Sequence, residues 1–140
     1  MILGSIFRYL AYLIHFPSGI LLSKDESSGT AWLYNRTTVP LFVCSPTFDD
    51  AHAPSDSPSS PHISVVKVPP GYSVAFFDYE KSRRVARRMA GRNSEGPFDP
   101  FSVHVSFYKG FGSNYKRSEV LQCPCWLRIL MAEEDDFRNR

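Results

Sequence analysis

The stretch that decides the fold is VHVSFYKGFGSNYKRSEVLQCPCW, residues 103–126. Residues 103–108 alternate between apolar and more polar side chains, which is the period-two pattern of a strand with one buried face. Gly110 and Gly112 then interrupt the alternation, and we expect them to adopt positive φ angles that let the loop approach a partner closely. The stretch therefore predicts a half-buried strand followed by a glycine-hinged loop.

This loop carries aromatic and cationic side chains as well as its glycines. Lysine and arginine pair well with phosphate and carboxylate groups, so the loop suits an anionic partner. The alternative is an ordinary surface loop whose charges are solvated. The candidate binding residues are Lys109, Gly110, Phe111, Gly112, Tyr115, Lys116 and Arg117.

Length and composition indicate a single globular domain. The chain has 140 residues, of which 43% are hydrophobic and 14% aromatic, and this favours a strand-rich core over disorder. Its net charge is only +2, so anion binding must depend on local clusters of cations. The three cysteines, an odd number, indicate a reducing compartment such as the nucleus or cytosol.

Residues 1–16 are apolar except for Arg8 and a few small or polar side chains. They lack the cationic start and cleavage site of a secretory signal, and they are shorter than the roughly 20 residues of a membrane span. The sequence favours a helix that packs on the core, or an unusual transcript start, over a membrane or signal role. Its apolar face comprises Ile2, Ile6, Leu10, Leu13 and Ile14.

Short apolar runs separated by turn residues predict about seven strands, arranged as a sandwich. Polar turns at 24–29 and 35–38 each predict a hairpin, and the proline- and serine-rich residues 48–62 predict a long exposed loop. The expected strands besides residues 103–108 are 20–22, 31–34, 40–44, 63–68, 72–77 and 125–131.

A helix is expected from Asp78, which suits an N-cap, to Gly91, a plausible terminator. Val85 and Met89 are predicted to point inward. The opposite side forms a candidate basic surface, for which we favour a solvated face, then a contact with an anionic protein, then nucleic acid. A nuclear-import signal and an extension of the basic surface around Lys109 are further interpretations. This surface comprises Arg83, Arg84, Arg87 and Arg88.

Catalytic and metal-binding motifs are not found in the sequence. It contains neither a glycine-rich phosphate loop nor a G-x-S-x-G elbow, and its four histidines lack metal-ligand spacing. Cys123-Pro124-Cys125 differs from the two-residue spacer of a zinc knuckle, so buried, reduced cysteines flanking the last strand are expected instead. We expect no enzyme activity, cofactor, metal or small-molecule substrate.

Several motifs in order make residues 19–131 resemble much of the Mad homology 2 domain of the Smad family. SFYKGFGSNYKRS with PCW resembles the receptor-contacting loop and final strand of that family. The resemblance continues backward through VVKVPPGYSV with FFDYEK, then WLYNRTTVPLFVCSPTFD, and finally GILLSK. The YNR, PLFV-x-SPT-x-D, KVPPGYS and CPCW motifs are most similar to the inhibitory branch.

The resemblance implies a mainly β fold, an antiparallel β-sandwich of the Smad/FHA-like kind with a loop-helix region at one end. It divides the chain into an atypical apolar segment (1–18), a partial, N-terminally truncated Mad homology 2 domain (19–131) and a tail that is acidic and then basic (132–140). The first strands and helix of the family are expected before Gly19, where an unrelated apolar stretch stands instead. Their absence would leave sheet edges and core side chains uncovered unless residues 1–16 partly replace them. The tail lacks the Ser-Ser-x-Ser motif of activated members, and the DNA-binding Mad homology 1 domain is not found, so direct sequence-specific DNA binding is not expected.

The function that the resemblance implies is inhibition of transforming growth factor beta or bone morphogenetic protein signalling. The expected partners are type I receptor serine/threonine kinases, other Smads and transcription factor complexes, in the cytoplasm and nucleus. By position, Lys109, Tyr115 and Arg117 would hold phosphate or acidic groups, the two glycines would shape the loop, and Phe111, a tryptophan in most relatives, would anchor it by packing. The alternatives are a nuclear transcriptional cofactor, a nucleic-acid site on the arginine helix, and an inert fragment.

Overall fold

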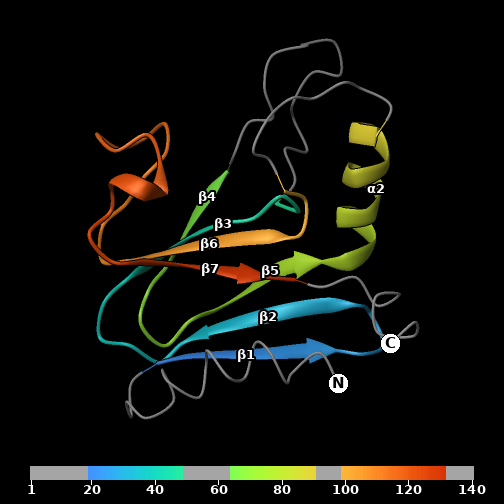
Figure 1. Ribbon diagram of the computed structural model, residues 1–140. Helices are drawn as coiled ribbons and strands as arrows, with labels where there is room; N and C mark the ends of the chain where they lie inside the picture. Colours follow the sequence, from blue (N-terminus) through green and yellow to red (C-terminus); the bar gives the residue numbers. More distant parts are fainter. Residues whose placement is uncertain (1–18, 49–63, 91–98, 132–140) are drawn as a thin grey trace.

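The structure is a computed structural model that describes residues 19–48, 64–90 and 99–131 (Figure 1). These residues form two antiparallel sheets that pack face to face, with one α-helix at an end of the sandwich. The mainly β fold expected from the sequence is confirmed. None of the helices in the described ranges is long and apolar enough to cross a membrane.

The first sheet has three strands in the order β1-β2-β5, namely β1 (Ile20–Asp25), β2 (Thr30–Asn35) and β5 (Ser73–Asp78). A tight turn joins β1 to β2, as predicted. Gly29 has a φ of +66° in this turn, and its N–H donates to the carbonyl of Asp25 at 2.9 Å. Glycine suits that position because a left-handed backbone is costly for other residues.

The second sheet has four strands in the order β4-β3-β6-β7, namely β4 (Val65–Val68), β3 (Leu41–Cys44), β6 (Ser102–Phe107) and β7 (Trp126–Leu130). The hairpin expected at residues 35–38 is wrong, because β2 and β3 lie in different sheets. Buried Asn35 supports this crossing: its amide donates to the carbonyls of Val39 and Val68, both at 2.9 Å. Asn35, which in the sequence indicated a hairpin turn, therefore stabilises the passage of the chain from one sheet to the other.

The main core lies between the sheets and takes alternate residues from their inner faces. In β5 the alternation fails, because a register shift against β2 at Ala31/Trp32 leaves both Phe76 and Phe77 buried. The largest contributors that are fully buried are Leu33, Leu41, Val43, Phe76, Phe77, Val103 and Val105.

The helix α2 (Tyr79–Ala90) follows β5 directly. Asp78 is its N-cap, since Asp78 Oδ1 accepts a hydrogen bond from the N–H of Lys81 at 3.0 Å. Tyr79 and Ser82 are the buried residues of the helix, and Val85 and Met89, which were predicted to point inward, are partly buried. The helix thus contacts the sandwich chiefly through its first turn. The predicted terminator Gly91, residues 1–18, most of the loop at 48–62 and the tail at 132–140 lie outside the described residues.

Candidate functional site

The loop between β6 and β7, residues 108–125 and here called the site loop, contains all the predicted binding residues. It includes the short 3-10 helix η1 (Val120–Gln122) and lies at the left of Figure 1. It forms a second apolar cluster with two residues on the outer side of β3. The buried members of this cluster are Phe42, Cys44, Phe111, Val120 and Cys123. Phe111, only 4% exposed, therefore anchors the site loop by packing.

Strand β6, which leads into the loop, is more buried than the predicted half-buried strand. Val103 and Val105 face the core, but Ser106 on the other side of β6 is also fully buried. Its hydroxyl donates to the carbonyl of Lys109 at 2.7 Å, and the thiol of Cys123 contacts the same carbonyl at 3.7 Å. The strand is covered on both faces here because its own continuation folds back over it.

The chain enters the loop through a strained turn at Tyr108. Tyr108 has a φ of +68° and is the only non-glycine residue with a positive φ in the described ranges. The N–H of Lys109 donates to the carbonyl of Phe107 at 2.8 Å, which makes this a γ-turn of the rare positive-φ kind. The Lys109 ammonium lies 4.4 Å from the centroid of the Tyr108 ring. This turn sets the direction in which Lys109 leaves the sheet.

The two loop glycines serve different purposes. Gly112 has a φ of +100°, as expected, but Gly110 is not among the residues with positive φ. A Cβ atom on Gly110 would lie 2.6 Å from two ring carbons of Tyr115, a distance at which one group must move. Gly110 is therefore required for the close approach of an aromatic ring within the same loop.

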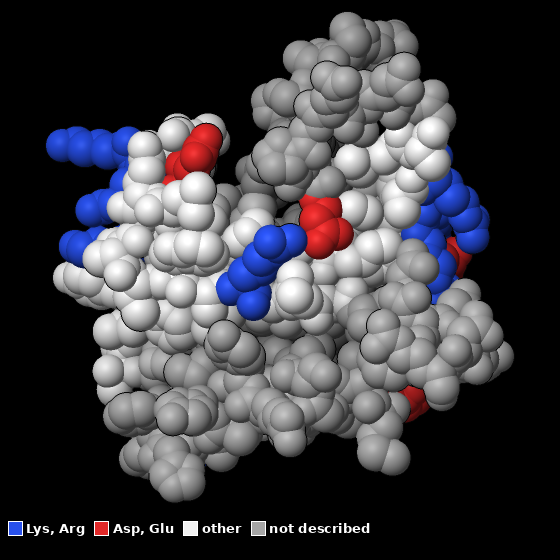
Figure 2. Space-filling view, in the orientation of Figure 1, with Lys and Arg blue, Asp and Glu red and all other residues white. Residues whose placement is uncertain are grey.

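Tyr115 is the centre of the exposed part of the loop. Its ring makes an edge-to-face contact with Phe42, with centroids 5.3 Å apart, and 43% of the residue stays exposed. The N–H of Gly112 donates to the carbonyl of Arg117 at 2.8 Å, so the backbone closes on itself around Tyr115. Lys116 is exposed and Arg117 partly exposed beside it. Figure 2 shows several cationic side chains extending from this end of the molecule.

A further cation, Lys67, was missed in the sequence. It is exposed on β4 and is the register partner of Phe42, the residue that the Tyr115 ring contacts. Directly paired residues of neighbouring strands project to the same face of a sheet. Lys67 therefore lies on the face that the site loop covers. In the sequence, the only sign of Lys67 was a lysine inside the apolar run VVKV. Its connection with the site loop depends on strand pairing, because the two are far apart in the sequence.

The arginines of α2 do not join this surface. Arg84, Arg87 and Arg88 are exposed and Arg83 is partly buried, and Arg84 pairs with Glu80 at 3.1 Å. The helix lies at the start of β6 and the site loop at its end, a strand length of about 20 Å. Cationic groups accordingly appear at opposite sides of the same view, as Figure 2 shows. The helix thus does not extend the surface around Lys109.

The three cysteines are free thiols in the structure. Cys44 and Cys123 are buried, whereas the expected burial of Cys125 is wrong because that residue is exposed. Burial raises the pKa of Cys44 to about 11. Among the described residues, no three His, Cys, Asp or Glu side chains are grouped so that they could hold a metal ion.

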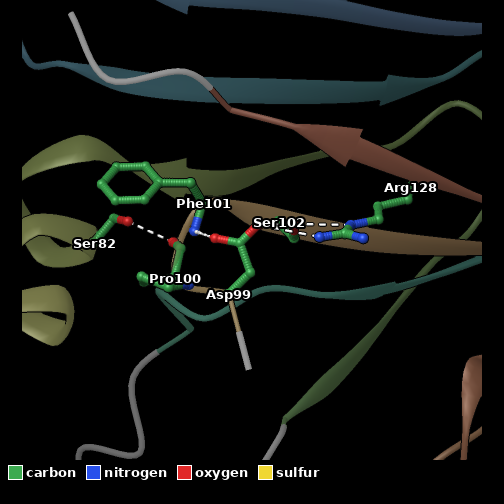
Figure 3. A network of polar contacts seen from close by, with 6 residues as sticks. All are labelled: Ser82, Asp99, Pro100, Phe101, Ser102 and Arg128. Atoms are coloured by element: carbon green, nitrogen blue, oxygen red, sulfur yellow. Dashed lines mark hydrogen bonds and ion pairs between the residues drawn. The ribbon is translucent and has the colours of Figure 1, made fainter. Parts of the chain in front are cut away.

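A polar network at the start of β6, the Asp99 brace, joins β6 to β7 (Figure 3). The Asp99 carboxylate accepts hydrogen bonds from the Phe101 N–H at 2.9 Å and from the Ser102 hydroxyl. It also accepts one from Arg128 Nη2 at 3.1 Å, while Arg128 Nε donates to the Ser102 hydroxyl at 2.9 Å. Burial alone would raise the pKa of Asp99, but these bonds and the Arg128 charge hold it below its usual value.

The same region includes α2 and His104. The Ser82 hydroxyl of α2 donates to the carbonyl of Pro100, so the helix and the brace meet at the same turn (Figure 3). Burial, and then the Arg128 charge, lower the pKa of His104, against an opposing effect of Asp99. The sequence contained no recognisable pattern for this network, because its members come from three elements. Its contacts are internal to the chain, which makes it a structural brace.

Comparison with known proteins adds independent findings. A family model described as "MH2 domain" matches residues 12–132. The chain is 45% identical over 114 residues to Mothers against decapentaplegic homolog 6 of Gallus gallus, covering 81% of this chain and 24% of that protein. It is 37% identical over 112 residues to homolog 7 of Homo sapiens, covering 80% and 24% respectively. It is 25% identical over 120 residues to Dwarfin sma-3 of Caenorhabditis elegans, covering 83% and 28%. The chain thus spans about a quarter of the length of these relatives.

Proposed function

Because the chain belongs to the MH2 domain family, we propose that it inhibits transforming growth factor beta or bone morphogenetic protein signalling. The relatives support the inhibitory branch of the Smad family: identity is 45% and 37% with homologs 6 and 7, against 25% with Dwarfin sma-3. The proposed activity is protein binding. It would take place in the cytoplasm and nucleus, with an indirect effect on transcription factor complexes.

The observation that carries this proposal is the construction of the site loop. Phe111 is buried beneath the loop, and the carbonyl of Lys109 is held by Ser106, so the base of the loop is fixed before any partner arrives. A loop fixed in this way loses little conformational entropy on binding. What it presents outward is the exposed side chains of Tyr108 and Tyr115 and a set of cations.

These groups suit a phosphorylated protein segment. A phosphoserine carries nearly two negative charges and strong acceptor oxygens near neutral pH, and clusters of lysine and arginine bind it through charge-assisted hydrogen bonds. Tyr115 offers an apolar edge for the flanking residues of the segment. The cations are Lys67, Lys109, Lys116 and Arg117.

We infer two ways in which such binding would inhibit signalling. The loop would occupy the phosphorylated surface of a type I receptor kinase, which a receptor-regulated Smad requires. Alternatively, it would pair unproductively with the phosphorylated tail of another Smad. Both use the same cations, so both depend on the site loop.

Charge reversal tests the proposal. The double variant Lys109→Glu with Arg117→Glu should fail to retain the phosphorylated kinase domain of a type I receptor in a pull-down assay, because two attractive charges become repulsive. The matched control is Arg84→Glu with Arg87→Glu, which reverses the same number of charges on α2. We expect the control to bind as the wild type does. Persistent binding by a folded loop variant, or equal loss in both variants, would show that the loop assignment is wrong.

A further inference from the structure

The outer face of the β1-β2-β5 sheet exposes a set of large apolar side chains. Leu21 is 45% exposed, Trp32 44% and Tyr34 37%, whereas their neighbours Ile20 and Leu33 point into the core. Leu21 and Tyr34 are direct partners in the β1–β2 register, so they lie side by side, with Trp32 two residues along the same strand face. These residues form one continuous patch.

Small side chains complete this face. Trp32 pairs with Ser23 on one side and with Ala75 on the other, and Tyr34 pairs with Ser73. We call this set the outer sheet face: Leu21, Ser23, Trp32, Tyr34, Ser73 and Ala75. None of these six described residues is charged. The Asp25 carboxylate at the end of β1 is held in the adjacent turn by Ser27 and Ser28. A contiguous uncharged apolar face of this kind is typical of a surface that another segment covers.

We propose that residues 1–16 of the same chain dock on the outer sheet face. Only residues 17–19 separate this segment from Ile20, the first residue of β1. The N–H of Arg36 donates to the carbonyl of Gly19 at 2.9 Å, which fixes the point where the preceding chain leaves the sheet. Pro17 and Gly19 are residues that commonly reverse the chain direction. The first face residue, Leu21, follows immediately.

The sequence of the segment matches this face in length and polarity. At about 100° per residue, Ile2, Ile6, Leu10 and Leu13 fall on one side of a helix, and Arg8 and His15 fall on the opposite side. Sixteen helical residues span about 24 Å. The six residues of β1 span about 20 Å, so the apolar stripe can cover the face along the strand.

Two further arguments favour this occupant. A segment joined by a short connection has an effective concentration of about the millimolar order, above that of a free second copy at ordinary protein concentrations. Interfacial helices that bind lipid usually carry several cations on the polar face. Residues 1–16 contain one, Arg8. Within the described ranges, the outer sheet face is therefore the apolar surface that best fits this segment.

Trp32 provides a direct reporter of this contact. The chain has two tryptophans, so in a Trp126→Phe background all tryptophan fluorescence comes from Trp32. We expect Leu10→Asp with Leu13→Asp to shift this emission to longer wavelength and to increase iodide quenching, because charges in the apolar stripe release the segment. Ser5→Asp with Ala11→Asp, which adds the same charge outside the stripe, should leave both signals unchanged.

A second measurement approaches the contact from the sheet. The amides of residues 2–16 should be protected from hydrogen exchange in the full chain and lose that protection in Trp32→Glu. Far-UV circular dichroism establishes that each variant is folded. Equal quenching in the stripe variant and its parent would overturn the proposal. A Trp32 emission that depends on protein concentration would also overturn it, because that result indicates a second copy of the chain on the face. Protection of Trp32 from iodide only in the presence of anionic lipid vesicles would overturn it as well.

Discussion

Gly110 and Gly112 stand two positions apart in the same loop, yet glycine is needed at each for a different physical reason. At Gly112 the backbone has a φ of +100°, which side chains with a Cβ atom rarely adopt. At Gly110 the constraint is the Tyr115 ring, which occupies the place of a Cβ atom. The sequence predicted a positive φ at both glycines, which is confirmed at Gly112 alone. The constraint at Gly110 could not be predicted, because the ring that imposes it belongs to a residue five positions later.

Gly110→Ala should therefore displace the Tyr115 ring. Because the ring is 43% exposed, it can swing outward, and we expect the free energy of unfolding to fall by only about 1 kcal/mol, the usual size of one aromatic pair. Urea denaturation measures this loss. In a Tyr115→Ala background the same Gly110→Ala change should cost much less, since the clash is gone. An equal cost in both backgrounds would show that the ring is not the cause.

At the scale of the elements, pattern alone placed the strands but not their environment. The apolar runs located all seven described strands, because side-chain alternation and turn residues are local properties. The same pattern did not predict burial where a segment distant in the sequence covers a surface. Ser106 is buried by the site loop, and the polar Ser82 is buried because α2 packs chiefly through its first turn. Asn35 has the composition of a hairpin turn but lies where the chain passes between sheets.

The Asp99 brace should make the junction of β6 and β7 sensitive to acid. The pKa of Asp99 is lowered in the folded protein, so its contribution is fully present above the usual value of 3.8 and is lost as the pH falls through the lower folded value. The difference in unfolding free energy between Asp99 and Asp99→Asn should thus be constant from neutral pH to about pH 4 and shrink below it. We expect at most about 1 kcal/mol, since the pair is partly exposed.

This comparison is best made in a His104→Gln background. The pKa of His104 lies below its usual 6.5, so the unfolded chain takes up its proton first, and stability falls as the pH drops below 6.5. The pH range in which His104 affects stability therefore lies above the range in which Asp99 does. Removing the imidazole leaves the Asp99 carboxylate as the group whose effect is measured. Urea denaturation at several pH values between 7 and 3 supplies the data. A difference that stays constant through the acid range would contradict the assigned role of Asp99.

At the scale of the whole molecule, the two basic surfaces lie at opposite ends of β6. The sequence identified the residues of both, because clusters of lysine and arginine are local features. It did not reveal their separation, nor that Lys67 pairs with Phe42 and so lies on the sheet face that the site loop covers. Both facts follow from strand order, which depends on contacts between residues far apart in the sequence. Only one of the two surfaces therefore belongs to the proposed binding site.

The central claim is that the site loop recognises phosphate on a signalling partner. Its most direct test is a titration of the full chain with the kinase domain of a type I receptor, once phosphorylated and once treated with phosphatase. We predict tight binding to the phosphorylated form alone, weakened by added salt and lost in Lys109→Glu with Arg117→Glu. Equal affinity for the two forms of the kinase domain would contradict the account.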